Sequence, residues 1–372
     1  MKLRSTMIPG CHEIAFRSRL GARGSFVKTF QAARCGHSAH RIPSLDGLRA
    51  IAILLVLFGH LIPSDLGLLL ASFGVQVFFV LSGYLITSLL QQEHAIEGQI
   101  DLCAFYRRRS FRIFPAAFAY MVVMAVVMPT TRAGLPYAVT YTVSYHLNNI
   151  PTALEHLWSL SVEEQFYLLW PFAIWLGFRF RAQIAWTAMF CSGAFRLVCA
   201  STHIVLPSPP HYLFPGAMDA LAAGCLAAIY APALKPHIDK LRDSTPIAIA
   251  LPVTAWTLNA LLWSGRASAL WGCVPILLAA SLLLVVERRD RILNNMVTGW
   301  LGALSYSVYL WQQPFTVVRV LSPIPAFGAL AVCAGASYFL IEKPMIAIGR
   351  GGLTVFGSQG IAENMIVEPV QE

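Results

Sequence analysis

Long apolar runs, separated by short polar loops, dominate the pattern of hydrophobic and polar positions along this chain. A helix needs about 20 mostly apolar residues to cross the roughly 30 Å hydrocarbon core of a bilayer. Ten runs approach that length. The pattern therefore predicts an all-α membrane protein, a polytopic bundle of about ten transmembrane helices at residues 45–63, 71–90, 112–129, 158–177, 183–202, 212–231, 246–264, 268–287, 298–318 and 324–342.

The composition agrees with this interpretation. Hydrophobic residues make up 57% of the 372 residues, charged residues only 12%, and the mean hydropathy is +0.62. Soluble domains carry about 25% charged residues, so a value half as large indicates that most of the chain lies in lipid. The eight cysteines form no C-x-x-C motif, and neither a disulfide framework nor a metal site is expected.

The placement of the basic residues predicts the orientation. With ten spans and a cytoplasmic N-terminus, all but four of the 27 Lys and Arg residues fall on the cytoplasmic side. This is the positive-inside pattern of a multi-pass protein of the cell (inner) membrane. The net charge of +9 is therefore explained by the orientation of the chain in the membrane, and no nucleic-acid partner is expected. The four basic residues on the other side of the membrane are Arg132, Arg196, Arg266 and Arg319.

The two ends of the chain differ from its apolar middle. Residues 1–41 are basic and lack the apolar core of a secretory signal, so we expect a disordered cytoplasmic arm rather than a transit peptide. Residues 42–345 form the predicted membrane domain, and residues 346–372 a cytoplasmic tail.

Three ionisable residues lie in the first predicted span, where such groups are costly and so mark functional positions. Arg49 and His60 are eleven residues apart, close to three helical turns, so they share one face about 16 Å apart along the axis. Asp46 precedes Arg49 by three residues and can pair with it. The spacing predicts a polar stripe facing the bundle interior, with His60 beyond the midplane. A snorkelling arginine and an interfacial histidine remain the alternative.

Arginines cluster where the third span begins. Arg109 and Arg112 have i,i+3 spacing, and Arg108 and Arg112 have i,i+4 spacing, so each pair shares a helix face. Guanidinium groups bind phosphate oxygens through paired hydrogen bonds, so the cluster suits a phosphorylated ligand. A simple positive-inside anchor is an equally open interpretation.

Two adjacent carboxylates, Glu163 and Glu164, lie on the fourth span. By the predicted topology they reach the depth of the first-span histidine, and a carboxylate can orient and polarise an imidazole. Ser159 and Tyr167 share a helix face with Glu163 at i,i+4 spacing. Structural pairing of a glutamate with a helix neighbour, such as Arg196 on the next span, is the alternative.

Six motifs, in order over roughly residues 42–345, resemble the acyltransferase 3 family of integral membrane O-acyltransferases. Members of that family transfer acyl groups, often acetyl from acetyl-CoA, to hydroxyls of cell-envelope or secreted glycans. The matching motifs are Ser44–Arg49 with His60, Phe78–Thr87, Phe105–Pro115, His156–Pro171, Ser305–Trp311 and Glu342–Pro344.

The family pattern places an essential Arg and His on span one, an R-x-x-R on span three and a Glu pair on span four. The resemblance implies acyl-CoA, typically acetyl-CoA, as donor, and no metal, because a thioester is already activated. Together with the spacings it predicts catalytic His60, Glu163 and Glu164, donor-binding Arg49, Arg108, Arg109 and Arg112, and supporting Asp46, Ser159 and Tyr167.

The resemblance also implies partners. A glycan or lipid-linked glycan accepts the acyl group, and membrane lipids surround the domain. Two departures from the family pattern stand out. Gln312 and Gln313 occupy the place where members often carry histidine, so acid–base work is not assigned there. A C-terminal hydrolase-like domain, present in some relatives, is not expected, so a separate extracytoplasmic transferase protein is a further candidate partner.

The predicted mechanism has the CoA phosphates at the cytoplasmic mouth, paired with the third-span arginines. His60 acts as general base on a sugar hydroxyl or carries the acyl group briefly, with Glu163 or Glu164 orienting it. An ion-coupled transporter of a small anionic or sugar substrate is the competing function, because buried paired charges also occur in carriers. No inverted repeat is visible in the sequence to support it.

Overall fold

The computed structural model describes residues 43–202, 204–263, 272–288 and 293–351. Within these ranges the regular structure is helical, with no strand. The predicted N-terminal arm and most of the predicted tail lie outside the described residues. The last helix continues to Gly349, past residue 345, where the membrane domain is predicted to end.

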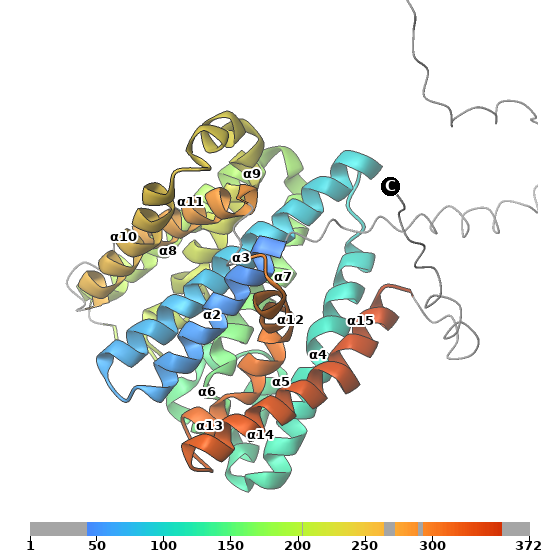
Figure 1. The fold of residues 1–372 in the computed structure, drawn as a ribbon, viewed down its shortest axis with the longest axis vertical. Helices are drawn as coiled ribbons and strands as arrows, with labels where there is room; N and C mark the ends of the chain where they lie inside the picture. The colour runs from blue at the N-terminus through green and yellow to red at the C-terminus, as the bar shows by residue number, and fades with distance from the viewer. Residues whose placement is uncertain (1–42, 203, 264–271, 289–292, 352–372) are drawn as a thin grey trace, which may run out of the picture. The chain divides into compact units, whose positions relative to one another are not determined.

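A helix is present at each of the ten predicted ranges, and Figure 1 shows how they are arranged. The bounds are α2 Pro43–Leu61, α3 Asp65–Glu97, α4 Leu102–Val127, α7 Leu157–Gly177, α8 Arg181–Thr202, α9 Phe214–Leu241, α10 Thr245–Trp263, α11 Cys273–Glu287 and α12 Met296–Trp311, and finally α14 Pro323–Ala336, which runs through the π-helical turn η7 Ser337–Glu342 into α15 Lys343–Gly349. Short helices and 3-10 turns connect them. The short helices are α5 Leu135–Val139, α6 Thr152–Glu155 and α13 Gln313–Thr316. The 3-10 turns are η1 Pro129–Gly134, η2 Val143–Tyr145, η3 Leu147–Asn149, η4 Phe178–Phe180 and η5 Pro210–Tyr212.

Seven helical stretches of the described chain are long and apolar enough to cross a membrane. One of them, Thr152–Thr202, is 51 residues long and contains α7 and α8. Two other helices, α11 and α12, have only 15 and 16 residues. The protein is thus a multi-pass membrane protein, and the part of it that the structure describes is all-helical.

Several helices extend beyond the apolar runs that predicted them. Helix α3 has 33 residues and ends at Glu97, before Gly98, whose φ of 73° is the left-handed conformation common after a helix C-terminus. Helix α4 begins at Leu102 because the Asp101 side chain accepts a hydrogen bond from the Ala104 amide. The arginines at 107–112 therefore lie within α4 and not at its start. Polar helix ends do not raise the hydropathy, so hydropathy alone underestimates helix length.

The centre of the described bundle is a close crossing of α3 with α9, flanked by α2, α8 and α12. Gly83 on α3 faces the Leu221 carbonyl of α9, and Gly224 on α9 faces the Val80 carbonyl of α3. A Cβ atom at either glycine would collide with that opposing carbonyl oxygen. Small residues permit such close approach of helices in membranes.

Replacing Gly83 by leucine is therefore expected to lower the free energy of unfolding in detergent by at least about 1–3 kcal/mol, because a tightly packed contact cannot absorb the added volume. The matched control is Gly335→Leu on α14, where no neighbouring heavy atom lies within 4 Å of the added Cβ. Equal losses in the two variants, measured by chemical denaturation, would contradict the close-crossing interpretation.

Candidate functional site

A central pocket of about 610 Å³ lies between α2, α3, α4, α7 and α12. Its lining combines guanidinium groups, hydroxyl groups and one carboxylate with the aromatic rings of Phe78 and Phe79. The polar lining residues are Arg49, Arg109, Arg112, Ser82, Ser159, Glu163, Tyr167, Ser305, Tyr306 and Tyr309.

Three arginines from two helices meet in this central pocket. The Arg49 guanidinium donates to the Asp46 carboxylate at 3.1 Å, so the first-turn acid of α2 holds it. The Arg109 guanidinium lies 3.8 Å from the centre of the Tyr167 ring, which is a cation–π contact. Arg112 lies within electrostatic range of both other arginines. The guanidinium groups outnumber the single carboxylate in the lining, so the pocket favours an anion.

Glu163 is held by a chain of hydroxyl groups. Ser82 Oγ donates to Glu163 Oε1 at 2.6 Å, and the Tyr167 hydroxyl donates to Ser82 Oγ at 3.0 Å. At the other end of the pocket, Ser159 Oγ lies 2.5 Å from the Tyr309 hydroxyl, which also donates to the His156 carbonyl at 2.9 Å. These contacts fix side chains of α3, α7 and α12 around one cavity.

A second carboxylate, that of Glu342, lies near Arg112 and Arg49. Glu342 lies in the π-helical turn η7, is 2% exposed and accepts a hydrogen bond from Ser307 Oγ at 2.9 Å. It lies within electrostatic range of Arg112 and Arg49. A π-helical turn shifts the facing of the residues that follow it, and such turns are frequent at functional sites.

His60 lies outside the lining of the central pocket. Its imidazole faces the Gln312 side chain and the Val56 backbone, and it lies within electrostatic range of His156. Gln312 is fully buried: its Oε1 accepts from Thr316 Oγ1 at 2.6 Å and its Nε2 donates to Gln313 Oε1 at 3.0 Å. The polar environment of His60 is thus built from α13 and the residues around it.

The sequence-predicted residues therefore divide into two groups. Six of them converge on the central pocket: Arg49, Arg109, Arg112, Ser159, Glu163 and Tyr167. The other four are Asp46, which contacts Arg49 from behind, Arg108, which points away toward Glu93 at 3.5 Å, Glu164, and His60. No hydrogen bond between His60 and Glu163 or Glu164 occurs in the part of the chain that the structure describes, so the expected carboxylate–imidazole contact is not formed.

Glu164 faces a different neighbour from Glu163. It lies within electrostatic range of Tyr141, and neither Glu164 Oε1 nor the Tyr141 hydroxyl has a hydrogen-bond partner among the described residues. Tyr141 lies in the loop after α5 with a φ of 54°. Burial and the Glu164 charge raise the pKa of the Tyr141 hydroxyl, which therefore stays protonated.

Arg196, the example of a structural partner for the glutamates, does not pair with either of them. Arg196 pairs with Asp219 at 2.6 Å, and both side chains are buried. Sequence reasoning also left Ser82, Tyr309 and Gln312 without a role. The first two lie within the quoted motifs Phe78–Thr87 and Ser305–Trp311, so the motifs marked their neighbourhood but not their contacts.

Comparison with known proteins identifies the family of this chain. A family model described as an acyltransferase domain matches residues 42–340. The chain belongs to this acyltransferase family. This is the family that the motif resemblance implied.

Two bacterial relatives illustrate the similarity. A peptidoglycan O-acetyltransferase of Listeria monocytogenes is 27% identical, over 83% of this chain and 56% of its own length. An O-acetyltransferase of Staphylococcus aureus is 29% identical, over 86% of this chain and 59% of its own length. The chain thus spans little more than half the length of these relatives. No solved structure matches it.

The described residues contain no group of three or more His, Cys, Asp or Glu side chains placed to hold a metal ion. The conspicuous charge in the central pocket is instead the arginine cluster.

Proposed function

We propose that this protein is a membrane O-acyltransferase that transfers an acetyl group from acetyl-CoA to a hydroxyl of a cell-wall glycan of the peptidoglycan type. The observation that carries the proposal is the convergence of Arg49, Arg109 and Arg112 on one pocket beside a hydrogen-bonded carboxylate. The names of the two relatives supply the acetyl group and the acceptor class.

The proposed topology has ten spans and a cytoplasmic N-terminus in the inner membrane. The 51-residue stretch Thr152–Thr202 supports it, because about 20 residues suffice for one crossing and this stretch has room for two. The 3-10 turn η4 at Phe178–Phe180 separates α7 from α8, which pack against each other. The excess of Lys and Arg in the predicted cytoplasmic loops supports the orientation.

The donor proposal follows from charge. Acetyl-CoA carries several phosphate charges, and guanidinium groups bind phosphate through short, paired hydrogen bonds. Arg109 and Arg112 would hold these phosphates on the side where CoA is made, and Arg49, steadied by Asp46, would hold the part of the donor that extends into the bundle. The exposed Arg108, paired with Glu93, would contribute least.

The reactive end of the donor would lie toward Ser159 and Tyr309, the end of the pocket nearest His60. Tyr309 and His156 have ring centres 5.7 Å apart, and His156 lies within electrostatic range of His60. His60 takes the proton of the acceptor hydroxyl, the new C–O bond forms as the C–S bond of the thioester breaks, and the proton passes to the departing thiolate. The acceptor is the glycan itself or a separate extracytoplasmic transferase that passes the acetyl group on.

The experiment measures transfer of radiolabelled acetyl from acetyl-CoA to peptidoglycan fragments by the purified full chain in lipid nanodiscs. Arg112→Gln is expected to raise the KM for acetyl-CoA about 10- to 100-fold, because a hydrogen bond to a charged group contributes about 1.5–3 kcal/mol. The matched control is Arg107→Gln, an exposed arginine on the same helix that does not line the pocket.

An unchanged KM for acetyl-CoA in Arg112→Gln would contradict the donor site. Absence of any CoA-dependent transfer by the wild type, together with uptake of a labelled sugar or anion into proteoliposomes, would contradict the enzyme proposal and favour a carrier.

A further inference from the structure

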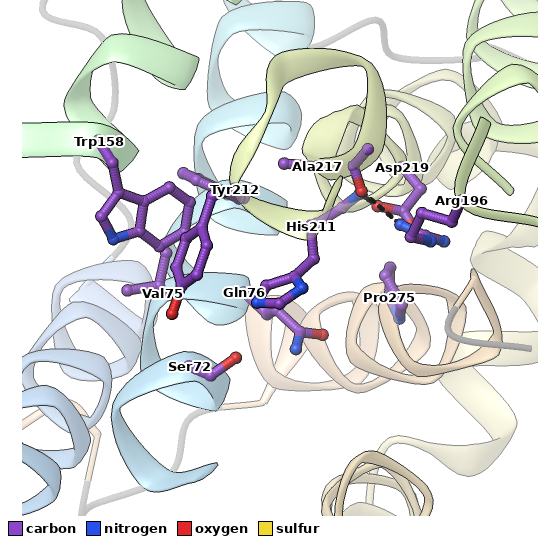
Figure 2. A pocket seen from close by; sticks show the side chains of 13 residues that line it. Ser72, Val75, Gln76, Trp158, Arg196, His211, Tyr212, Ala217, Asp219 and Pro275 are labelled. Carbon is purple, nitrogen blue, oxygen red and sulfur yellow. Dashed lines mark hydrogen bonds and ion pairs between the residues drawn. The ribbon is translucent and has the colours of Figure 1, made fainter. Parts of the chain in front are cut away.

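A second pocket adjoins the central pocket at α3. We call it the Trp158 pocket, and Figure 2 shows its side chains. The residues that matter for its chemistry are Ser72, Gln76, Trp158, Arg196, His211 and Tyr212.

The two pockets share a wall. Val75 and Phe79 line both, and Trp158 immediately precedes Ser159, which lines the central pocket. The Phe79 and Trp158 rings meet edge to face, with centres 6.0 Å apart and an interplanar angle of 86°. An occupant of the Trp158 pocket is thus separated from the central pocket by a few side chains.

The charges of the Trp158 pocket are compensated. Arg196 is closed onto Asp219 at 2.6 Å, with both side chains about 5% exposed, and it also donates to the Gly216 carbonyl. His211 lies in the turn η5, and burial together with the Arg196 charge lowers its pKa to about 4. The imidazole is therefore neutral at physiological pH. In contrast to the central pocket, this pocket suits an uncharged ligand.

The lining also has the two features that bind sugar rings. Trp158 and Tyr212 present aromatic surface, with ring centres 4.5 Å apart at 80°, and the negative face of an aromatic ring attracts the C–H groups of a pyranose. Figure 2 shows His211 and Gln76 beside these rings around the same space. Planar polar groups of this kind form directed hydrogen bonds to hydroxyl and acetamido groups.

Two polar atoms have capacity for a ligand. Gln76 Nε2 is committed to Asn259 Oδ1 at 2.9 Å, so its Oε1 is the atom that can accept from a sugar hydroxyl. Arg196 Nε is buried and has no hydrogen-bond partner among the described residues, although Arg196 is only 4% exposed. A buried donor without a partner is costly, and a hydroxyl or acetamido oxygen in the pocket would satisfy it.

We propose that the Trp158 pocket binds an uncharged pyranose ring of the acceptor glycan, and that the Phe79–Trp158 wall is where the acceptor hydroxyl enters the central pocket. The second half of this proposal rests on the proposed acetyl transfer, whereas the first half is a binding property that can be measured without it. In the proposed topology the pocket lies at the extracytoplasmic end of the bundle, where such glycans are displayed.

The test measures binding of an uncharged N-acetylglucosamine tetrasaccharide to the purified full chain in nanodiscs by isothermal titration calorimetry. His211→Phe keeps the ring beside Tyr212, with which His211 has a centre distance of 4.3 Å, but removes its hydrogen bonds. Trp158→Leu removes the aromatic surface. Each variant is expected to weaken binding about tenfold or more, since each removes contacts worth roughly 1.4 kcal/mol. The matched control is His94→Phe, a histidine stacked on Phe178 at 3.7 Å that lines neither pocket.

Binding that is absent in the wild type, or equal in the wild type and both pocket variants, would overturn the sugar site. A parallel transfer assay separates this from the proposed function. The expected result is a raised KM for the saccharide in His211→Phe with the KM for acetyl-CoA unchanged. Saccharide binding that depends on His211 and Trp158, without transfer by the wild type, would keep the sugar site and refute the acetyl transfer and the entry at the wall.

Discussion

Replacing His60 by alanine is expected to lower the rate of acetyl transfer by about 10²–10⁴-fold, the usual contribution of a positioned general base. The imidazole is partly buried beside Gln312 and lies within electrostatic range of His156, whose ring centre is 5.7 Å from that of Tyr309 in the central pocket. The KM for acetyl-CoA should change little, because the donor's phosphates are proposed to bind at the arginines. The measurement is kcat with labelled acetyl-CoA at saturating glycan.

The matched control for this prediction is His237→Ala, the same substitution at an exposed position of α9. It should leave kcat within about twofold, since surface substitutions usually have small effects. A His60→Ala protein with the unfolding midpoint of the wild type and an undiminished kcat would refute the catalytic assignment. Partial recovery of transfer on adding imidazole would support it.

Replacing Arg196 by alanine is expected to reduce the free energy of unfolding by about 3–5 kcal/mol, because it leaves the Asp219 carboxylate buried without its partner. Arg196 joins α8 to α9 by contacts to both the Asp219 side chain and the Gly216 carbonyl. The loss should appear in chemical denaturation in detergent micelles, monitored by tryptophan fluorescence or circular dichroism.

Two comparisons identify the buried pair as the cause. Changing both partners, Arg196→Met with Asp219→Leu, should recover most of the stability, since apolar replacements of buried ion pairs are often neutral. Lys235→Ala breaks the pair of Lys235 with Glu287, whose side chains are 52% and 37% exposed, and it should lower the stability much less than Arg196→Ala because water screens exposed charges. If the double variant were as unstable as Arg196→Ala, the loss would have to come from the Gly216 contact or from packing.

The sequence by itself located the helices. Membrane spans need long apolar runs, and that requirement is local, so a helix occurs at each of the ten predicted ranges. The polar extensions of α3 and α9 were missed because they are not apolar and depend on capping and packing. The sequence also indicated the family, because the order of six motifs along the chain can be recognised without knowing how the helices pack.

The sequence determined part of the site through helix geometry. The i,i+3 spacing of Arg109 and Arg112 predicts one shared face, and both residues line the central pocket. The i,i+4 spacing of Arg108 and Arg112 equally predicts a shared face, yet the Arg108 side chain pairs with Glu93 and does not line the pocket. The difference lies in which side of α4 the neighbouring helices cover, and no spacing within α4 contains that information.

Only the tertiary structure decided between Glu163 and Glu164, which are about 100° apart around α7. Ser82 of α3, close in space but 81 residues away in sequence, holds Glu163 in the pocket, while Glu164 faces the Tyr141 loop. The tertiary structure likewise surrounded His60 with Gln312 and His156 in place of the expected glutamate. Apolar length and helical spacing are local properties that the sequence reveals, whereas contacts between helices depend on rotations and crossings that only the packed bundle fixes.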